Sequence, residues 1–153
     1  MSSRMLPHAL RTPPFRDSEF TPTEWSSAAD KAWFGNHLLR FIAEDFPPTL
    51  FTKRFYNRLS LTFGHIAHYN MHGFWGVFFE DLPGKIHFLE QTAAWPCHGD
   101  PEFTFSDVER AVARRIAPTG LIERYRTALA DEFEQSERQQ LDRLKAKYEG
   151  VAR

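Results

Sequence analysis

Apolar residues recur at helical spacing through most of this chain, and the pattern predicts a mainly α-helical, compact domain of about five helices. The first helix is expected from Thr21 to about Asp45. Thr21 and Glu24 have the spacing of a capping box, and Pro22 suits the first helical position. Apolar residues cover more than one side of this segment, as expected for a helix that is buried between other elements or carries an interface.

The second helix is predicted from about Pro48 to Asn70, where the apolar residues form one stripe. Asn70 and Gly73 are both candidate C-terminal caps of this helix. The aromatic run that follows, residues 74–80, is expected to be an irregular connection with at most one short strand.

Three further helices are predicted in the second half of the chain. A short one is expected over residues 85–94, and a loop rich in proline and glycine follows it. Ser106 begins the sequence of another capping box, which opens a helix ending near Ala117. Thr119 is the predicted cap of the last helix, which should reach about Glu149.

The last helix changes character along its length. Apolar residues up to Phe133 can pack on the domain, whereas residues 134–140 contain no apolar side chain. Apolar residues then return in steps of three and four at Leu141, Leu144 and Tyr148. This is coiled-coil spacing over fewer than two heptads, so the tip is either a solvated end or a small oligomer seam.

By length, the 153 residues form one domain with two extensions. Three prolines interrupt residues 1–20, which predicts an irregular arm. This arm is either disordered or docked on the domain or a partner, with Phe15 and Phe20 as its anchors. Residues 21–135 form the predicted helical domain, and residues 136–153 form the projecting end of the C-terminal helix.

Composition narrows the classes of function. The 19 basic and 20 acidic residues give a net charge of −1, so no field of the whole protein gathers nucleic acid. No apolar run reaches the roughly 20 residues that a membrane helix needs, and the N-terminus has no apolar segment typical of a secretory signal. The single cysteine, Cys97, fits a reducing compartment. We therefore expect a cytoplasmic protein without membrane or nucleic-acid partners.

The aromatic content of 15% is unusual. Aromatic side chains dominate the energetics of both cores and interfaces. Either the core uses phenylalanine where other proteins use aliphatic residues, or part of the aromatic set serves a partner surface. The candidate contact residues are Tyr69, Trp75 and Phe78 around the aromatic run and Leu141, Leu144 and Tyr148 on the last helix.

Three histidines, His65, His68 and His72, lie within eight residues. On a continuous helix they would share one face, and His68 and His72 have the i, i+4 relation that lets two imidazoles bind one ion such as zinc. His65 and His72 would be about 10.5 Å apart along the axis, so one ion would need ligands from elsewhere. Candidates for those ligands are His37, Cys97 and His98.

The other catalytic constellations are weaker. No carboxylate occurs over residues 64–79 to act as a base, and the His-Glu-x-x-His pattern of zinc proteases is absent. The neighbouring Cys97 and His98 do not make a nucleophile and base, because such partners come together in space and not in sequence. The alternative interpretation of the histidines is a set of core or interface residues with one hydrogen bond each.

Arg110, Arg114 and Arg115 form a small basic patch in a segment with the outline of a helix-turn-helix. The following helix carries Glu123 and Asp131 where a DNA-reading helix would carry basic or polar residues, and these acids would repel phosphates. The sequence therefore favours an ordinary αα-hairpin over a nucleic-acid-binding motif.

The leading hypothesis is a non-enzymatic cytoplasmic binding or regulatory protein that acts through protein–protein contacts and needs no cofactor. Small phage and plasmid proteins that modulate host machinery are the analogy for this hypothesis. The alternatives are a metal-dependent enzyme built on the histidine cluster and a nucleic-acid-binding helical protein.

Overall fold

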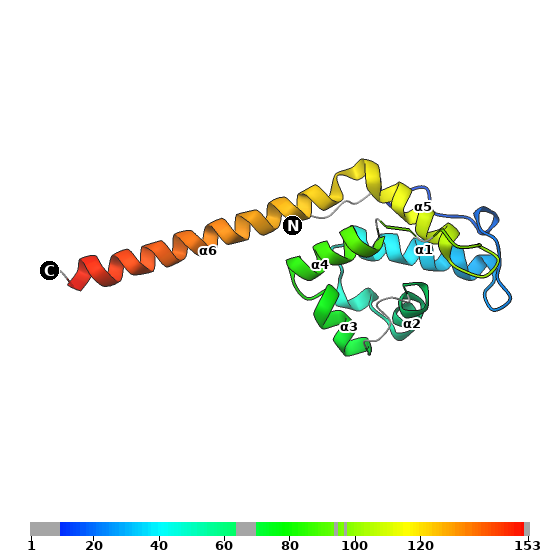
Figure 1. The fold of residues 1–153 in the computed structure, drawn as a ribbon, viewed down its shortest axis with the longest axis horizontal. Coiled ribbons are helices and arrows are strands. Elements are labelled where there is room, and N and C mark those ends of the chain that lie inside the picture. The colour runs from blue at the N-terminus through cyan, green and yellow to red at the C-terminus, as the bar shows by residue number, and fades with distance from the viewer. Residues whose placement is uncertain (1–9, 64–69, 94, 97, 152–153) are drawn as a thin grey trace.

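The computed structural model describes residues 10–63, 70–93, 95–96 and 98–151, and over these residues the chain is helical, without a β-strand (Figure 1). The α-helices are α1 (Ala28–Ala43), α2 (Lys53–Thr62), α3 (Met71–Phe78), α4 (Leu82–Phe88), α5 (Ser106–Ile116) and α6 (Leu121–Val151). Three 3-10 segments (Asp17–Glu19, Pro48–Leu50, Ala117–Thr119) and a π-helical segment (Leu89–Ala93) complete the set. The prediction of a mainly α-helical fold is confirmed, and the short strand near residues 74–80 is replaced by α3.

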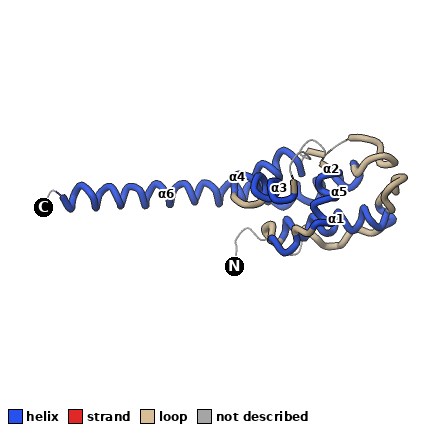
Figure 2. Tube along the Cα trace, turned by 90° about the horizontal axis from the view of Figure 1, so that it is seen from below, coloured by secondary structure: helices blue, strands red, loops and turns tan. Residues whose placement is uncertain are grey.

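One helix, α6, leaves the domain. Figures 1 and 2 show the other helices packed together at one end of the molecule, while most of α6 extends away from them. The 31 residues of α6 correspond to roughly 46 Å of helix. Every residue from 131 to 150 is exposed, which confirms the predicted projecting helix. None of the described helices combines the length and the apolar character needed to cross a bilayer.

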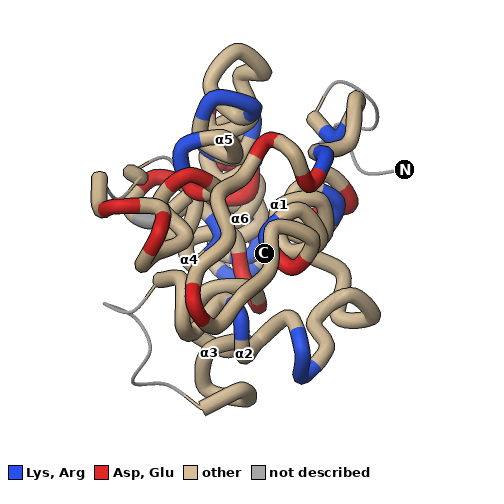
Figure 3. Tube along the Cα trace, turned by 90° about the vertical axis from the view of Figure 1, so that its right-hand side faces the viewer, with Lys and Arg blue, Asp and Glu red and all other residues tan. Residues whose placement is uncertain are grey.

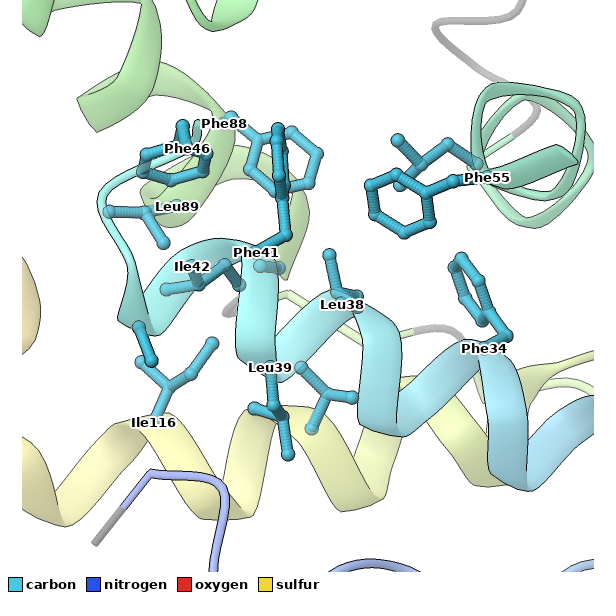
Figure 4. Close-up of a cluster of buried hydrophobic side chains, with 14 of the residues drawn as sticks. Phe34, Leu38, Leu39, Phe41, Ile42, Phe46, Phe55, Phe88, Leu89 and Ile116 are labelled. Carbon is cyan, nitrogen blue, oxygen red and sulfur yellow. The ribbon is translucent and has the colours of Figure 1, made fainter. Parts of the chain in front are cut away.

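The centre of the domain is α1, which packs against α5 on one side and toward α2 on the other. In Figure 4, Leu39 is directed toward Ile116 of α5. On the opposite side, Phe34 and Phe41 face Phe55 of α2, with ring centroids 5.9 and 5.1 Å from the Phe55 ring. Both apolar sides of α1 are thus covered by the domain itself. Of the two predicted alternatives, α1 is a helix buried between other elements.

Phenylalanine rings fill much of the core. The ring of Phe79 lies 5.0 Å from both Phe41 and Phe88, in edge-to-face geometries that favour aromatic pairs. The aromatic excess is therefore divided between a phenylalanine core and a smaller exposed set. The buried rings include Phe34, Phe41, Phe46, Phe55, Phe63, Phe74, Phe78, Phe79 and Phe88. The exposed aromatic side chains are Trp25, Trp95, Phe103, Phe133 and Tyr148.

The start of α1 lies later than predicted. Ser27 is the N-cap, and its hydroxyl accepts a hydrogen bond from the Asp30 backbone N–H at 3.1 Å. The Thr23 hydroxyl instead accepts from the backbone N–H groups of Trp25 and Ser26, which holds a turn before the helix. The predicted cap at Thr21 is wrong, because the helix begins at a later capping residue, Ser27.

The segment predicted as one helix from residue 48 to 70 is divided. Thr52 caps α2, which ends at Thr62. Asn70 caps the N-terminus of α3, where its side-chain oxygen accepts from the Gly73 backbone N–H at 2.7 Å. The predicted C-cap role of Asn70 is therefore wrong. Asparagine is also a favoured N-cap residue, and here it begins the following helix.

Helix α4 begins earlier than the predicted start at residue 85. The Asp81 carboxylate caps it by accepting from the Gly84 backbone N–H at 2.9 Å, and Pro83 lies in its first turn. A side chain at Gly84 would overlap the carbonyl oxygen of Val77 in α3. The absence of a Cβ at this position therefore allows α3 and α4 to pack closely.

The two helices of the predicted αα-hairpin begin differently. Ser106 is the first residue of α5 and not its cap, since its buried hydroxyl donates to the Gly99 carbonyl at 2.6 Å. The predicted capping box is therefore wrong. Thr119, the predicted cap of the last helix, is the last residue of the 3-10 segment Ala117–Thr119, and its hydroxyl accepts from the Leu121 backbone N–H at 3.2 Å. The residue directly before α6 is Gly120, which adopts a left-handed φ of 69° between the helices.

Residues 10–20 of the arm lie against the domain. Leu10 is fully buried, and Phe15 and Phe20 are each 7% exposed. A Cβ at Gly35 of α1 would lie 2.8 Å from Cδ2 of Phe15, so the arm rests where α1 carries no side chain. Docking on the domain is confirmed for these residues, with the two predicted anchors in place, and the rest of the arm lies outside the described residues.

Candidate functional site

The first turns of α6 attach it to the domain. Leu121 and Tyr125 are buried, and the Tyr125 hydroxyl donates to Oδ1 of Asp45 at 2.5 Å. Asp45 has a left-handed φ of 62° in the turn after α1, and Nζ of Lys85 lies 3.4 Å from the same oxygen. One carboxylate thus ties the end of α1 to both α4 and α6.

A second contact holds α6 beside the π-helical segment after α4. The Arg126 guanidinium donates to both carboxylate oxygens of Glu90, at 2.8 and 3.2 Å. The hydrogen bond from Arg126 lowers the pKa of Glu90. Ala128 and Leu129 follow this bidentate pair and still pack against the core, whereas every residue from 131 to 150 is exposed. The direction of α6 is therefore fixed before residue 131.

Beyond this point α6 carries four large apolar side chains in solvent, which we call the exposed stripe. Their exposed fractions are 62% for Phe133, 51% for Leu141, 43% for Leu144 and 64% for Tyr148. At 100° per residue, the four positions fall within an arc of about 80° on one side of the helix. Phe133 joins the three residues predicted at the tip, because the helical phase brings it to the same side.

The exposed stripe adjoins the side of α6 that packs on the domain. Ile122 and Leu129 are partly buried against the core, and their helical phases lie within about 40° of Phe133. The buried Leu121 and Tyr125 lie about 120° and 80° from Phe133, so the stripe is rotated away from the centre of the packed side.

The aromatic run gives less surface than predicted. Phe78 is 2% exposed and belongs to the core. Trp75 is half-buried, and its ring lies 5.3 Å from Phe51 and 5.7 Å from Phe79. Trp75 also borders a shallow apolar groove of about 390 Å³, whereas Tyr69 lies outside the described residues.

The histidine cluster is only partly described, since His65 and His68 lie outside the described residues. His72 is exposed in the first turn of α3, a helix that begins after Asn70 and does not continue α2. The described residues on either side, α2 ending at Thr62 and Asn70 as the N-cap of α3, do not form the one continuous helix on which the shared face was predicted. Within the described part of the chain, no three His, Cys, Asp or Glu side chains are placed to hold one metal ion. A zinc site stays a prediction.

Of the other ligand candidates, His37 lies among aromatic rings of the core and Cys97 is outside the described residues. His37 Nε2 is 2.7 Å from the Leu50 carbonyl oxygen, and its ring centroid is 4.4 Å from Phe55. Burial lowers the pKa of His37, and the hydrogen bond to Leu50 offsets part of that effect. His98 is exposed in the loop before α5. His37 thus has the structural role of a core histidine with one hydrogen bond.

One of the three candidate arginines holds the arm. Arg115 donates to the carbonyl oxygens of Leu10 at 3.2 Å and Pro13 at 2.7 Å, and its guanidinium lies 4.6 Å from the centroid of Phe15. Arg114 is exposed and Arg110 is partly buried. Figure 3 shows basic segments on α5 with acidic segments nearby.

A second apolar surface, not predicted from the sequence, borders a groove of about 480 Å³ beside α2. Trp25, Leu61 and Phe103 are 76, 73 and 66% exposed around it. The guanidinium of Arg58 lies 4.9 Å from the ring centroid of Phe105 and donates to the Ser26 hydroxyl at 3.2 Å. The sequence did not indicate this surface, because Trp25 lies in the part of the first predicted helix that is not helical.

Comparison with protein-family models, curated proteins and solved structures found no match to this chain.

Proposed function

We propose that this protein is a non-enzymatic binding protein that acts through protein–protein contacts, with the exposed stripe of α6 as its contact surface. One observation carries the proposal. Apolar side chains continue along α6 past the domain as Phe133, Leu141, Leu144 and Tyr148, on one side of the helix that adjoins the packed side, and no described element covers them. A helix that served only as a solvated extension would be polar on all sides.

The projecting part of α6 lacks the packing that normally stabilises a helix, and this supports the same function. Most of the stability of a protein helix comes from packing one apolar face against other elements. Residues 131–150 lack such packing, and the described side chains there contribute one exposed i, i+4 ion pair, Glu134–Arg138 at 2.7 Å. A partner that covers the exposed stripe would supply the missing burial.

Site-directed photo-crosslinking in the cells that produce the protein tests the contact surface. A benzophenone amino acid is introduced at Leu144 in the exposed stripe, and at Asp142 in a matched control. Two residues on a helix differ by about 200° in direction, so the two probes face nearly opposite sides. We expect a discrete protein adduct from position 144 and none from position 142, identified by mass spectrometry. No adduct at either position, or the same adduct at both, contradicts the proposed function.

A further inference from the structure

We propose that the partner of the exposed stripe is a second copy of this chain, bound through the same stripe with the two α6 helices antiparallel. This inference rests on the proposed function of α6 as a contact surface and names its occupant.

The charge pattern of the projecting part of α6 sets the orientation. Residues 131–137 contain four acidic side chains and no basic one, namely Asp131, Glu132, Glu134 and Glu137. Residues 138–147 contain four basic side chains and one acidic one, namely Arg138, Arg143, Lys145, Lys147 and Asp142. With a twofold axis near residues 140 and 141, antiparallel helices place residues 131–137 of each copy beside residues 144–150 of the other, which carry Lys145, Lys147 and Glu149. Glu134 then lies opposite Lys147, while Arg138 lies opposite Arg143, so the favourable charge contacts are at the two ends of the helix pair. Parallel helices would align like charges, which disfavours that arrangement.

The apolar positions suit the same arrangement. Phe133 and Tyr148 stand at the two ends of the exposed stripe, about 22 Å apart along the axis, with the leucines between them. A twofold axis near residues 140 and 141 brings Phe133 of each copy beside Tyr148 of the other. Aromatic pairs of this kind are favourable beyond their buried area.

The shape of the molecule leaves room for this pairing. In Figures 1 and 2 the domain lies at the N-terminal end of α6, and no other helix lies beside its C-terminal half. Antiparallel pairing therefore places the two domains at opposite ends of the helix pair. The contact is the same surface on both copies and closes as a twofold dimer, without open growth.

The chain exposes 9407 Å², whereas a compact monomer of 17.9 kDa exposes about 8,000 Å². The excess reflects the extended shape of the molecule, in which residues 131–150 of α6 are exposed on every side.

Sedimentation equilibrium of the full chain, up to about 100 µM, tests the inference with four variants and one control. E134K/E137K reverses the acidic residues, K145E/K147E reverses the basic residues that lie beside them in the partner copy, and the combined variant exchanges the two. L141Q/L144Q removes the centre of the exposed stripe, and D142Q on the opposite side is its control. Circular dichroism of each variant at 222 nm checks that the domain remains folded.

We expect the wild type and D142Q to sediment as a dimer, with twice the mass of 17.9 kDa. Each half-reversal should weaken the dimer about tenfold or more, and the combined variant should recover to within about threefold of the wild type. L141Q/L144Q should be monomeric.

Three results would overturn the inference. A monomeric wild type contradicts self-association. The proposed function is then tested separately, by whether the probe at position 144 captures a different protein. A half-reversal that binds as tightly as the wild type indicates parallel helices. A dimer that persists in L141Q/L144Q places the interface elsewhere.

Discussion

Lys31 shows how a single buried charge holds this domain together. Its side chain is fully buried, and Nζ lies 2.8 Å from the Pro101 carbonyl, 2.9 Å from the Thr104 carbonyl and 2.9 Å from Oδ1 of Asp107. The ammonium also lies 5.3 Å from the ring centroid of Phe105. One lysine of α1 thus fixes the loop before α5 and the first turn of α5.

Replacing Lys31 by methionine should destabilise the domain strongly. The substitution keeps most of the apolar stem but leaves the Asp107 carboxylate and two carbonyl oxygens without their cation. Removing one partner of a buried ion pair costs about 3–5 kcal/mol, and because Asp107 is 14% exposed we expect about 3 kcal/mol from urea unfolding. As a control, R40Q breaks an exposed i, i+4 pair and should change the free energy of unfolding by at most about 0.5 kcal/mol. Equal effects of the two substitutions would contradict this role of Lys31.

His37 should make the stability depend on pH. Burial lowers its pKa in the folded protein below the ordinary value of 6.5, so the unfolded chain takes up a proton first as the pH falls. The stability is complete above pH 6.5 and decreases as the pH falls below that value toward the folded pKa. We expect urea unfolding at pH 7 and pH 5 to show a smaller decrease in H37Q than in the wild type. H98Q, at an exposed position, should behave as the wild type does, and an unchanged decrease in H37Q would refute the prediction.

At the scale of elements, the competition between possible caps decided where helices begin. Thr21 and Ser27 both precede helical sequence, and only Ser27 caps α1. Asn70 caps the helix after it and not the one before it. Local sequence identifies residues that can cap, but the choice among them depends on which start lets the apolar residues of the helix reach the core. Gly35 and Gly76 illustrate the same dependence inside helices.

Alanine at Gly35 and at Gly76 should have opposite effects. In α1, a Cβ at Gly35 meets Phe15 at 2.8 Å and Val108 at 3.3 Å, so the arm must shift. In α3, a Cβ at Gly76 meets only Glu80 Oε2, at an ordinary 3.7 Å. We expect G35A to lower the free energy of unfolding by about 1–2 kcal/mol, a typical cost of overpacking. G76A should raise it by up to about 1 kcal/mol through helix propensity.

Limited trypsin digestion distinguishes displacement of the arm from general destabilisation in G35A. Cleavage after Arg11 and Arg16 should be faster in G35A than in the wild type, while cleavage within the domain should follow global stability. G35A as stable as G76A, with unchanged cleavage of the arm, would show that Phe15 adjusts without cost.

At the scale of the whole molecule, the projecting part of α6 lies outside the packing of the domain. The Arg126–Glu90 pair and the packing of Ala128 and Leu129 hold α6 on the domain, and residues 131–150 are exposed. The stability of the domain should therefore not depend on the tip, whereas association should depend on it entirely.

A chain that ends at Gln135 tests this separation. Its free energy of unfolding should stay within about 0.5 kcal/mol of the full chain, at a concentration low enough to keep the full chain monomeric. The shortened chain should sediment as a monomer at every concentration at which the full chain is a dimer. A loss of stability above about 2 kcal/mol would mean that the tip packs on the domain in solution.

The sequence by itself determined the helical class, the two apolar sides of α1 and the apolar tip of α6, and it named Phe15 and Phe20 as anchors in case the arm docks. These features depend on helical periodicity and on runs of proline, which are local properties of the chain. Tertiary structure alone decided that Phe78 belongs to the core, that α3 is a separate helix, that Lys31 is buried and that Arg115 holds the arm. These outcomes depend on which segments meet in space. The identification of the exposed stripe needed both, because periodicity places its residues on one side of α6 and only the position of the domain shows where α6 becomes uncovered.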